Sequence, residues 1–474
     1  MDEFSNPLVE RYASREMVAN FSTLRRFRLW RELWIALAET EKELGLAISD
    51  EQLAEMRAHK DDIDLARAAE LESRFRHDVM AHIEHFGEQC PRAKPIIHLG
   101  ATSSFVGDNT DLIQMRDGML ILVKRLVALI RALREFAIRE RATYCLGFTH
   151  FQPAQPVTAG KRACLWLQDF LMDLDELDGR IAELRFHGSK GTVGTQASFL
   201  ELFAGDHAKV EELDRRIAEK MGFARTFAVT GQIYPRKVDW QILATLCGIA
   251  QSAHKMATDI RLLQGLGELE EPFEDTQIGS SAMPYKRNPM RSERACSLAR
   301  FLMSSCLNAA MTSSVQWLER SLDDSANRRI VIPESFMAAD AVLLICTNVA
   351  TRLRVNRAIA ARNLEKQLPF LASEVILMEA TKRGGDRQSL HQRIRHHSMA
   401  VVEEMRAGGP NTLLDRLRDD PAFAPLRGEM ASLSEPKRFA GRAAEQVDEF
   451  VARCVDPVVQ KYADSQTSQS DLRV

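Results

Sequence analysis

Four segments of this sequence carry apolar residues at strictly alternating spacings of three and four. They are residues 112–136, 163–184, 246–263 and 336–353. Such a ladder lies on one face of a helix and is typical of long helices that pack side by side in heptad register. The chain must bury these matching stripes against one another, which predicts an elongated helical bundle from about 105 to 355.

The scarcity of helix breakers supports the same interpretation. Gly and Pro total 24 and 16 among 474 residues, and these two types most often interrupt regular structure. A fifth helical stretch is expected between Pro289 and Pro333, because the residues between them include neither type. The length allows about three domains. We predict an all-α chain with an N-terminal helical domain (1–102), a central long-helix bundle (103–355) and a C-terminal helical domain (356–474) that ends in a frayed tail.

The fourth ladder belongs to a segment that is apolar nearly all round. Residues 336–350 read FMAADAVLLICTNVA, and a helix of this kind has to be covered on several sides. Two interpretations stay open on this pattern alone. The segment is either the central helix of one chain's bundle or part of the core of a homo-oligomer in which whole bundles pack together.

The net charge and the spacing of the cysteines indicate which partners this chain can bind and in which compartment it is found. Lys and Arg total 63 and Asp and Glu 66, a net charge of −3, whereas a nucleic-acid-binding domain is usually basic. The acidic N-terminal residues do not resemble a secretory signal, and the apolar segments 119–138 and 336–350 are too interrupted or too short to span a bilayer. The eight cysteines lack CxxC spacing and fit a reducing compartment. We expect a cytoplasmic protein.

The longest segment without helical periodicity is residues 271–289, which read EPFEDTQIGSSAMPYKRNP. Loops of this length in a folded protein are usually functional or disordered. Gly279 permits unusual backbone angles, two prolines stiffen the second half, and Lys286, Arg287 and Asn288 offer hydrogen-bond donors to an anion. These residues alone indicate either an anion-binding lid or a solvated surface loop.

Three further clusters could carry chemistry. The turn at 149–153 contains His150, whose side chain is suited to proton transfer near neutral pH. The hydroxyl-rich turn at 100–104 precedes the first long helix, where it either binds an anion or serves as an ordinary N-cap. The segment 320–329 gathers three arginines and two aspartates. Its arginines either clamp a phosphate or pair with the neighbouring aspartates.

A fourth cluster is the sequence RHD at residues 76–78, which His82 and His85 follow. The spacing of these two histidines occurs in metal sites, but no further ligand pattern accompanies it. We therefore interpret them as histidines on a helix surface. The glycine-rich stretch 187–195 lacks the residue order of a phosphate-binding P-loop, so it does not predict a nucleotide site of that kind.

Taken together, these clusters resemble the fumarase/aspartase superfamily, whose members share a loop that reads SSxMPxKxNP. Here residues 280–289 read SSAMPYKRNP, with every fixed position present. The wider sequence resembles the adenylosuccinate lyase branch of that superfamily along almost its whole length. The other matching motifs are ERYAS (10–14), RHDVMAH (76–82), GATSS (100–104), GFTHFQPAQ (147–155), GTQASF (194–199), TGQ (230–232) and LDDSANRR (322–329).

The resemblance implies a lyase that eliminates fumarate from two nucleotide substrates of purine synthesis. These are adenylosuccinate, which yields AMP, and succinyl-aminoimidazole carboxamide ribotide (SAICAR), which yields AICAR. It also implies that the enzyme uses neither a metal nor a redox cofactor and has no nucleic-acid or membrane partner. Members of this family are homotetramers in which three subunits contribute to each active site, so the resemblance implies that the central bundle assembles into a tetrameric core.

The resemblance also implies roles for individual residues. Ser280 is the expected general base and His150 the general acid, and Lys286 and His77 are expected to act in catalysis as well. A serine hydroxyl is a poor base, so Lys286 and nearby amide groups are expected to activate it as the loop closes. The residues expected to hold the succinyl carboxylates are Thr102, Ser103, Thr149, Gln232, Lys286 and Asn288. Those expected at the phosphate and ribose are Arg11, Tyr12, Arg320, Ser325 and Arg329, and Arg76, His77, Asp78 and Arg294 are expected to line the site.

Two alternative functions can be weighed against the same residues. Sister lyases that act on argininosuccinate, malate or aspartate share the loop, but they bind no nucleotide phosphate. The arginines of 320–329 and the RHD cluster therefore speak against them. A helical scaffold protein that had lost its activity would be signalled by the loss of Ser280 or His150, and both residues are present.

Overall fold

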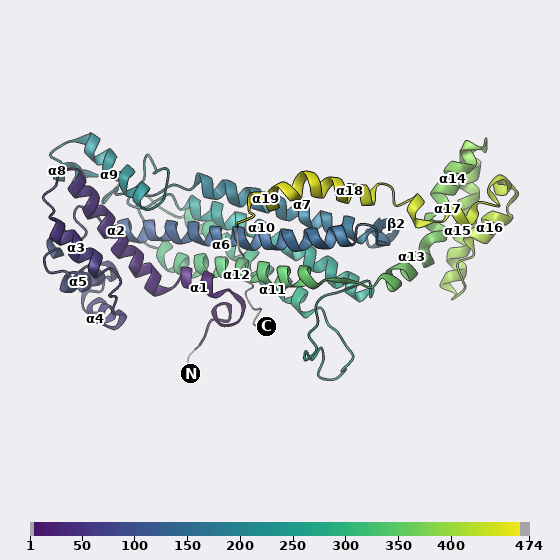
Figure 1. The fold of residues 1–474 in the computed structure, drawn as a ribbon, viewed down its shortest axis with the longest axis horizontal. Coiled ribbons are helices and arrows are strands. Elements are labelled where there is room, and N and C mark those ends of the chain that lie inside the picture. Colours follow the sequence, from purple (N-terminus) through teal and green to yellow (C-terminus); the bar gives the residue numbers. More distant parts are fainter. Residues whose placement is uncertain (1–3, 465–474) are drawn as a thin grey trace.

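The computed structural model describes residues 4–464, and its centre is a bundle of long helices that run side by side (Figure 1). The α6 helix alone has 37 residues, which makes it about 55 Å long at about 1.5 Å per residue. The predicted all-α fold with a central long-helix bundle is confirmed. The five bundle helices are α6 (Ser103–Arg139), α7 (Ala159–Glu183), α10 (Lys237–Gly265), α11 (Met290–Ser314) and α12 (Asp324–Arg352).

The apolar ladders account for the way in which these helices pack. Every ladder residue of α6 is at most 1% exposed, and the ladders of α10 and α12 are buried along their whole length. On α7 the ladder is buried as far as Leu177, and Ile181 is partly exposed. The four stripes join in one continuous hydrophobic core. Burial of these stripes is the main stabilising contribution to the bundle.

The N-terminal region covers one end of the bundle with short helices (Figure 1). Trp30 and Trp34 are 2% and 1% exposed and pack edge to face, as expected from their spacing of one turn. The α9 helix, which comes later in the sequence, packs against α2. The elements at this end are η1 (Leu8–Tyr12), α1 (Arg15–Asn20), α2 (Thr23–Glu43), α3 (Asp50–Ala58), α4 (Leu65–Phe75), α5 (Asp78–Gln89), η2 (Lys94–Ile96), α8 (Ala197–Leu202) and α9 (His207–Lys220).

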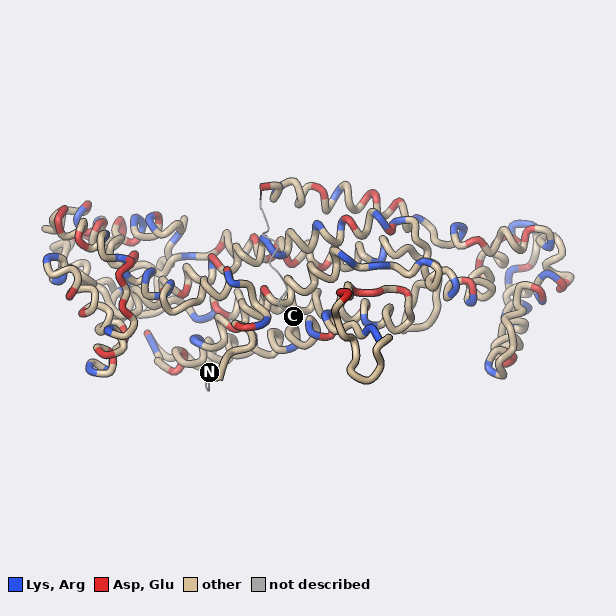
Figure 2. Tube along the Cα trace, turned by 60° about the horizontal axis from the view of Figure 1, so that its bottom comes forward, with Lys and Arg blue, Asp and Glu red and all other residues tan. Residues whose placement is uncertain are grey.

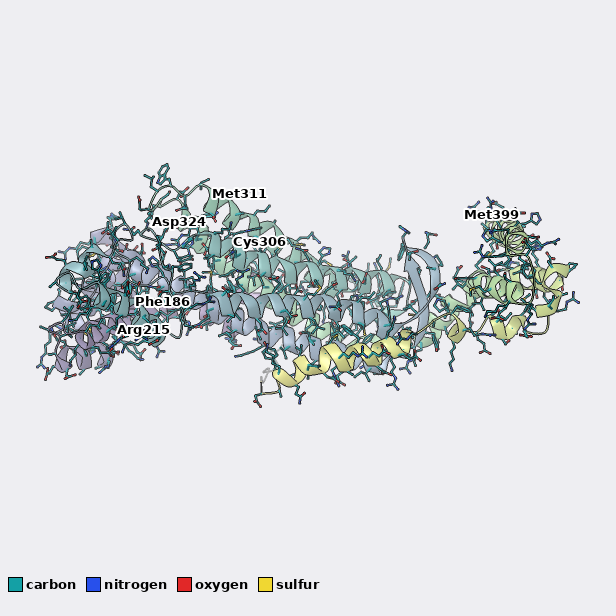
Figure 3. The ribbon with its side chains drawn as sticks, turned by 90° about the horizontal axis from the view of Figure 1, so that it is seen from above. Phe186, Arg215, Cys306, Met311, Asp324 and Met399 are labelled. Atoms are coloured by element: carbon teal, nitrogen blue, oxygen red, sulfur yellow. The ribbon has the colours of Figure 1, made fainter. Side chains whose placement is uncertain are left out.

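The C-terminal region covers the opposite end, where Met399 lies far from Asp324 (Figure 3). It has a hydrophobic core of its own, formed by residues between 372 and 439. The chain then returns to the bundle, where α18 packs on α7 and residues Val447, Val451 and Val455 join the main core. The elements are α13 (Arg357–Leu371), α14 (Ser373–Lys382), α15 (Arg387–Arg406), α16 (Leu413–Asp419), η3 (Pro421–Leu426), α17 (Met430–Leu433), η4 (Pro436–Arg438), α18 (Ala443–Phe450), η5 (Val451–Val455) and α19 (Asp456–Lys461).

Charged residues of both signs are interspersed over the whole length of the molecule (Figure 2). This distribution agrees with the nearly neutral net charge. The predicted frayed tail falls almost entirely outside the described residues.

Two small antiparallel ribbons interrupt the helical architecture. One pairs β1 (Tyr144–Thr149) with β2 (Gln152–Thr158), and the other pairs β3 (Leu269–Glu270) with β4 (Arg354–Val355). The turn predicted at residues 149–153 is flanked by two strands that the sequence pattern does not predict. The second strand contains two prolines, which remove donors from a ladder and therefore hide a strand from the sequence pattern.

The fifth helical stretch predicted between Pro289 and Pro333 is wrong in its extent. The helix α11 ends at Ser314, and α12 begins at Asp324 and continues through Pro333. A helix was expected to end at Pro333 because proline lacks the backbone N–H that donates a hydrogen bond inside a helix. Tertiary packing outweighs that local cost, because α12 is buried among the other bundle helices on both sides of the proline.

The α12 helix also corrects the expectation that no segment is long and apolar enough to span a bilayer. It starts 12 residues before Phe336 and therefore passes that test by length and composition alone. Its most apolar 18-residue window is 72% buried inside the protein. Most of its apolar surface is thus covered by other parts of the same chain, an arrangement that fits both interpretations of its all-round apolar surface.

The interpretation of His82 and His85 as surface residues is also wrong, because each is 3% exposed. His82 packs between Phe27 and Trp30, and burial lowers its pKa to about 4. His85 accepts the backbone N–H of Asp64 through Nε2 at 3.0 Å. Both residues are therefore neutral and lie in the interior of the N-terminal region.

Glu41 gives a prediction about stability. Its carboxyl group is fully buried, neither oxygen has a hydrogen-bond partner among the described residues, and burial raises its pKa from 4.5 to about 9. The unfolded chain releases this proton near pH 4.5 and the folded chain retains it, so the free energy of unfolding falls as pH rises between those values. We expect Glu41→Gln to increase stability by about 2–3 kcal/mol at pH 7.

Chemical denaturation at pH 5 and pH 8 would measure this effect. The gain for Glu41→Gln should be larger at pH 8, whereas Glu43→Gln, a change at an exposed neighbour on the same helix, should show no such gain. An equal or smaller gain at pH 8 would contradict the burial of a neutral Glu41 carboxyl group.

Candidate active site

A cavity of about 430 Å³ opens where the N-terminal helices meet the first turns of α6 and α12. Its walls come from segments that are far apart in the sequence, and they contain both arginines and hydroxyl groups. The predicted site residues that line it are Arg76, His77, Asp78, Ser103, Arg320, Ser325 and Arg329. The structure therefore gathers the RHD cluster, the hydroxyl-rich turn and the 320–329 segment at one place.

The RHD cluster lies in the tight turn between α4 and α5. Arg76 ends α4 in the left-handed conformation, with φ of 56°, and His77 is the N-cap of α5. The Nδ1 atom of His77 accepts the backbone N–H of Met80 at 3.4 Å, which leaves Nε2 free to face the cavity. Asp78 accepts a hydrogen bond from Arg329 at 3.0 Å. This turn therefore presents both a proton-transfer group and a cation at the cavity wall.

Arg320 is held at the cavity wall by neutral groups. Its Nη1 donates to the hydroxyl of Ser104 at 2.5 Å and to Oε1 of Gln232 at 2.7 Å. The backbone N–H of Gln232 donates to the carbonyl of Glu319 at 3.1 Å, and this approach requires Gly231, because a Cβ there would lie 2.4 Å from that carbonyl oxygen. No carboxylate of the described residues pairs with Arg320, so its charge remains available to an anionic ligand.

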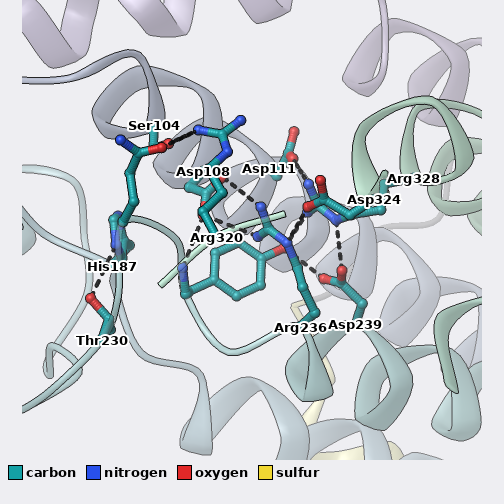
Figure 4. A network of polar contacts seen from close by, with 12 residues as sticks. Ser104, Asp108, Asp111, His187, Thr230, Arg236, Asp239, Arg320, Asp324 and Arg328 are labelled. Atoms are coloured by element: carbon teal, nitrogen blue, oxygen red, sulfur yellow. Dashed lines mark hydrogen bonds and ion pairs between the residues drawn. The ribbon is translucent and has the colours of Figure 1, made fainter. Parts of the chain in front are cut away.

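A buried ion network beneath the cavity fixes these elements (Figure 4). Arg236 donates to both oxygens of Asp108 at 3.0 Å and to Asp324 at 2.6 Å. Arg328 donates to Asp239 at 2.7 Å and pairs with Asp111 at 2.9 Å. Burial is the largest single influence and opposes the ionisation of Asp108. The charges of Arg236, His187 and Arg328 and the hydrogen bond to Arg236 together outweigh it and hold the pKa of Asp108 below its ordinary value.

Most of this network is not predictable from the sequence pattern. Its one available signal was the presence of Asp108 and Asp111 on α6, next to an apolar ladder. The contacts also show how the arginines of segment 320–329 are paired. None of its three arginines is paired with Asp323 or Asp324 among the described contacts, because Asp324 is taken by Arg236. Arg320 has only neutral partners among the described residues, Arg329 pairs with Asp78 at the cavity wall, and Arg328 belongs to the buried network.

Thr149 and His150 lie elsewhere, at the tip of the β1–β2 ribbon. Thr149 pairs with Gln152, so His150 and Phe151 form a two-residue turn, with φ of 53° and 57°. Both residues therefore adopt a left-handed conformation that Asn and Gly favour in such a turn. Neither His nor Phe is favoured there, and strain of this kind is found at functional sites. The turn holds an exposed imidazole at the end of a short, stiff ribbon.

The strain at His150 leads to a prediction that separates stability from activity. Asn tolerates the left-handed conformation better than His, so His150→Asn should leave the free energy of unfolding unchanged or raise it by up to about 1 kcal/mol. The same change should reduce turnover by at least about 100-fold, because it removes a proton-transfer group. Thermal unfolding and a turnover assay on the same samples would measure the two effects. A variant that keeps its turnover would contradict a role for His150 in proton transfer.

The 271–289 loop projects from the bundle (Figure 1) and is organised from within. The Oγ atom of Ser280 accepts the backbone N–H groups of Ala282 and Met283 at 3.3 and 3.1 Å. Asn288 donates to the carbonyl of Gly279 at 2.8 Å. A side chain at Gly279 would place its Cβ 1.9 Å from the carbonyl oxygen of Lys286. The loop is therefore an ordered turn with an exposed Lys286 at its tip.

The base of the loop is fixed to the bundle by polar groups. Glu271 is buried and accepts the backbone N–H groups of Arg291 and Ser292 at 2.8 and 2.9 Å, and burial raises its pKa above the ordinary value. Arg352, at the end of α12, donates to Glu274 at 2.5 Å. Arg294 lies in the first turns of α11 beside this base. Only the tip of the loop is therefore left without contacts to the bundle.

The predicted residues are thus separated within one chain. The cavity lies at the start of α6 and α12, whereas the His150 turn follows the end of α6 and the Ser280 loop contacts the end of α12. These helices have 37 and 29 residues, so about 40–55 Å separates the two ends. Arg11 and Tyr12 form a third position, in η1, which packs against α12.

Comparisons with known proteins identify the family. A model of the lyase family matches residues 15–303, and a model of the adenylosuccinate lyase C-terminus matches residues 369–450. The adenylosuccinate lyase of Schistosoma mansoni is 51% identical over 100% of this chain and 99% of its own length. That of Saccharomyces cerevisiae is 50% identical over 97% of this chain and 96% of its own length. The chain belongs to the adenylosuccinate lyase family.

Solved structures agree with this assignment at the level of the fold. A 3-carboxy-cis,cis-muconate lactonizing enzyme from Pseudomonas putida superposes with a TM-score of 0.83 at 23% identity, over 97% of this chain and 100% of its own. A fumarate lyase from Mesorhizobium sp. BNC1 superposes with a TM-score of 0.82 at 22% identity, over 94% and 99%. The fold expected for a member of the adenylosuccinate lyase family is therefore the fold observed.

Proposed function

We propose that this protein catalyses the elimination of fumarate from adenylosuccinate, which gives AMP, and from SAICAR, which gives AICAR. The observation that carries the proposal is the cavity with Arg320, whose charge no carboxylate among the described residues neutralises. Ser325 and Arg329 lie in the same wall. Guanidinium and hydroxyl groups in this arrangement suit a phosphate group. The cavity therefore favours a phosphorylated substrate over the substrates of the sister lyases.

The proposed chemistry needs a base and an acid on opposite faces of the succinyl group. Ser280 Oγ acts as an alkoxide after its hydroxyl proton has passed to solvent. It takes the proton from the carbon next to a carboxylate, and the electron pair spreads into that carboxylate. The C–N bond then breaks, the carbon–carbon double bond of fumarate forms, and His150 gives a proton to the leaving nitrogen. The two N–H groups that Ser280 Oγ accepts stabilise negative charge on that oxygen. They support its role as a base.

Binding of the charged groups completes the proposed site. Lys286 and Asn288 hold the succinyl carboxylates together with Thr102, Ser103, Thr149 and Gln232. Arg11, Tyr12, Arg320, Ser325 and Arg329 hold the phosphate and ribose, and Arg76, His77, Asp78 and Arg294 surround them. Preorganised cations at these positions lower the energy of the transition state, in which charge builds up on the carboxylate.

The separation of these groups within one chain supports a homotetramer with shared sites. Three subunits would supply the cavity, the His150 turn and the Ser280 loop. The exposed side of α11 supports such packing, since Leu307 and Met311, which lie one turn apart on one face of this bundle helix, are 52% and 62% exposed. Apolar side chains that line up on a surface helix commonly mark a protein interface. A second copy of the bundle is the partner that this surface fits.

Two further predictions belong to the same proposal. We place the protein in the cytoplasm, because all eight cysteines are free thiols and reduced cysteines are typical of that compartment. We also place the domain boundaries near residues 102 and 355. The separate hydrophobic core of residues 372–439 supports the second boundary.

Fumarate release by the purified protein tests the proposed function. Fumarate absorbs ultraviolet light, so its release can be followed directly with adenylosuccinate, SAICAR, argininosuccinate, malate and aspartate as substrates. Release from the two nucleotide substrates alone is expected. Release from argininosuccinate, malate or aspartate alone would assign the protein to a sister activity, and no release from any substrate would favour a scaffold role.

Arg329 provides a test of the phosphate site. Its guanidinium is half-exposed and bonded to Asp78, so Arg329→Ala leaves the buried network intact. We expect KM for adenylosuccinate to rise about 10–100-fold, because a hydrogen bond to a charged group is lost. A dephosphorylated substrate analogue should show little change. An equal rise in KM for the analogue would contradict the phosphate role.

A further inference from the structure

A second basic cavity, of about 330 Å³, lies at the other end of the bundle, between the end of α6 and the start of α13. Eight residues line it, and they include four arginines and one glutamate. The arginines are Arg139 from α6, Arg352 from α12, Arg354 from β4 and Arg357 from α13. None of them belongs to the proposed active site. We propose that this cavity is a binding site for an oligophosphate group.

The single acidic group in the wall is already engaged. Glu140 is 4% exposed and accepts hydrogen bonds from Thr143 at 2.7 Å, from Arg357 at 3.1 Å and from Arg139 at 3.2 Å. Burial opposes its ionisation, but these donors outweigh burial and hold the pKa of Glu140 below its ordinary value. Glu140 is shared by Arg139 and Arg357, Arg352 pairs with Glu274 outside the wall, and Arg354 has no ion pair among the described residues, so the wall keeps an excess of positive charge.

Capping of helix ends explains two of the four arginines. Arg139 and Arg352 lie in the last turns of α6 and α12, where cations are favoured, and Arg139 donates to the carbonyl of Leu353 at 3.1 Å. Capping of helix ends does not explain Arg354 and Arg357. Arg357 lies in the first turn of α13, where the helix dipole disfavours a cation, and Arg354 directly precedes that helix.

The surroundings of Arg354 and Arg357 favour an anion. Arg354 is exposed, and no ion pair to it is found among the described residues. The N-cap residue Asn356 does not cap α13, because its side chain donates to Gly267 and Glu270 instead. The 15-residue helix α13 therefore begins at the cavity wall without a side-chain cap. A helix N-terminus combined with several guanidinium groups is a well-suited phosphate site.

The cavity also contacts the base of the 271–289 loop. Arg352 donates to Glu274, which accepts a second hydrogen bond from Arg291 at 3.0 Å. An oligophosphate in the cavity competes with Glu274 for Arg352 and leaves the loop base held by fewer contacts. Bound anion is therefore expected to make the loop more mobile. This link to regulation rests on the proposed function of the loop, whereas binding itself does not.

Calorimetric titration of the full-length protein with tripolyphosphate tests the binding. Tripolyphosphate also fits the phosphate pocket at Arg329, so two variants separate the sites. Arg354→Glu should weaken binding at the second cavity at least tenfold and leave fumarate release unchanged, whereas Arg329→Ala should leave that binding unchanged. Arg406→Glu, on an exposed face of α15, is the control for loss of positive charge. Arg357→Gln is a second variant for the case in which Arg354→Glu does not fold.

Three outcomes would overturn the proposal. They are no binding beyond the Arg329 pocket, equal binding by wild type and Arg354→Glu, and equal loss of binding in Arg406→Glu. A parallel titration with a nucleoside triphosphate distinguishes a free oligophosphate from a nucleotide as the ligand. Trypsin cleavage after Lys286 or Arg287 reports on the loop without any assay of activity. Faster cleavage with tripolyphosphate is expected in wild type but not in Arg354→Glu, and an unchanged rate in wild type would overturn the link to the loop.

Discussion

Replacing Ser280 with Ala should reduce the turnover number for fumarate release by about 10²–10⁴-fold, the range typical of the loss of a general acid–base group. The change removes the oxygen that accepts two backbone N–H groups and leaves no group in that position to take a proton. Steady-state kinetics with adenylosuccinate would measure the loss. Thermal unfolding should be unaffected, because Ser280 lies in the loop and outside the hydrophobic core.

Ser281→Ala is the matched control for this experiment. The two serines are adjacent in the same exposed loop, but the described contacts of Ser280 Oγ have no counterpart at Ser281. Ser281→Ala should therefore keep turnover within a few-fold of wild type. Full activity in Ser280→Ala, or equal losses in both variants, would show that Ser280 is not the base.

Mixing two inactive variants should restore activity if sites are shared between subunits. Ser280→Ala removes the proposed base, and His150→Ala removes the proposed acid. In a mixed tetramer, some sites receive Ser280 and His150 from subunits that carry the other substitution. With random mixing of equal amounts, about a quarter of the sites combine two intact groups. We expect activity to rise from nearly zero to about a quarter of the wild-type value when the subunits exchange, as measured by fumarate release.

The control uses the double variant Ser280→Ala, His150→Ala mixed with Ser280→Ala. No site in that mixture contains an intact Ser280, so activity should stay at the level of the single variants. If Ser280 and His150 of one chain served the same site, the first mixture would also stay inactive despite complete exchange of subunits. Native mass spectrometry would confirm that mixed tetramers had formed.

The sequence predicted the bundle because burial of the apolar ladders dominates the packing of these helices. The ladder of α6 was buried residue by residue as expected. Expectations based on the helix- and strand-breaking effect of proline were wrong where tertiary packing stabilises the helix or strand. Pro333 lies inside α12, and the proline-containing strand β2 forms next to the His150 turn.

The candidate site was predictable in part, because its motifs resemble a known family. The structure adds two things that no local pattern contained. The first is the network in which Arg236 and Arg328 bind aspartates from α6, α10 and α12. The second is the distance along the bundle between the cavity and the groups at its other end. Both depend on contacts between residues more than 80 positions apart, which a linear sequence does not reveal.

The return of α18 and α19 to the bundle makes the C-terminal domain an insertion in terms of chain connectivity. The chain enters it through α13, leaves it after η4 and then supplies Val447, Val451 and Val455 to the main core. Two covalent crossings therefore tether the residues between α13 and α18 to the bundle. Deletion from the C-terminal side would remove α19 and α18 from the bundle before it reached the core of residues 372–439. An internal deletion that joins α13 to α18 would remove most of that core and keep α18 and α19 on the bundle.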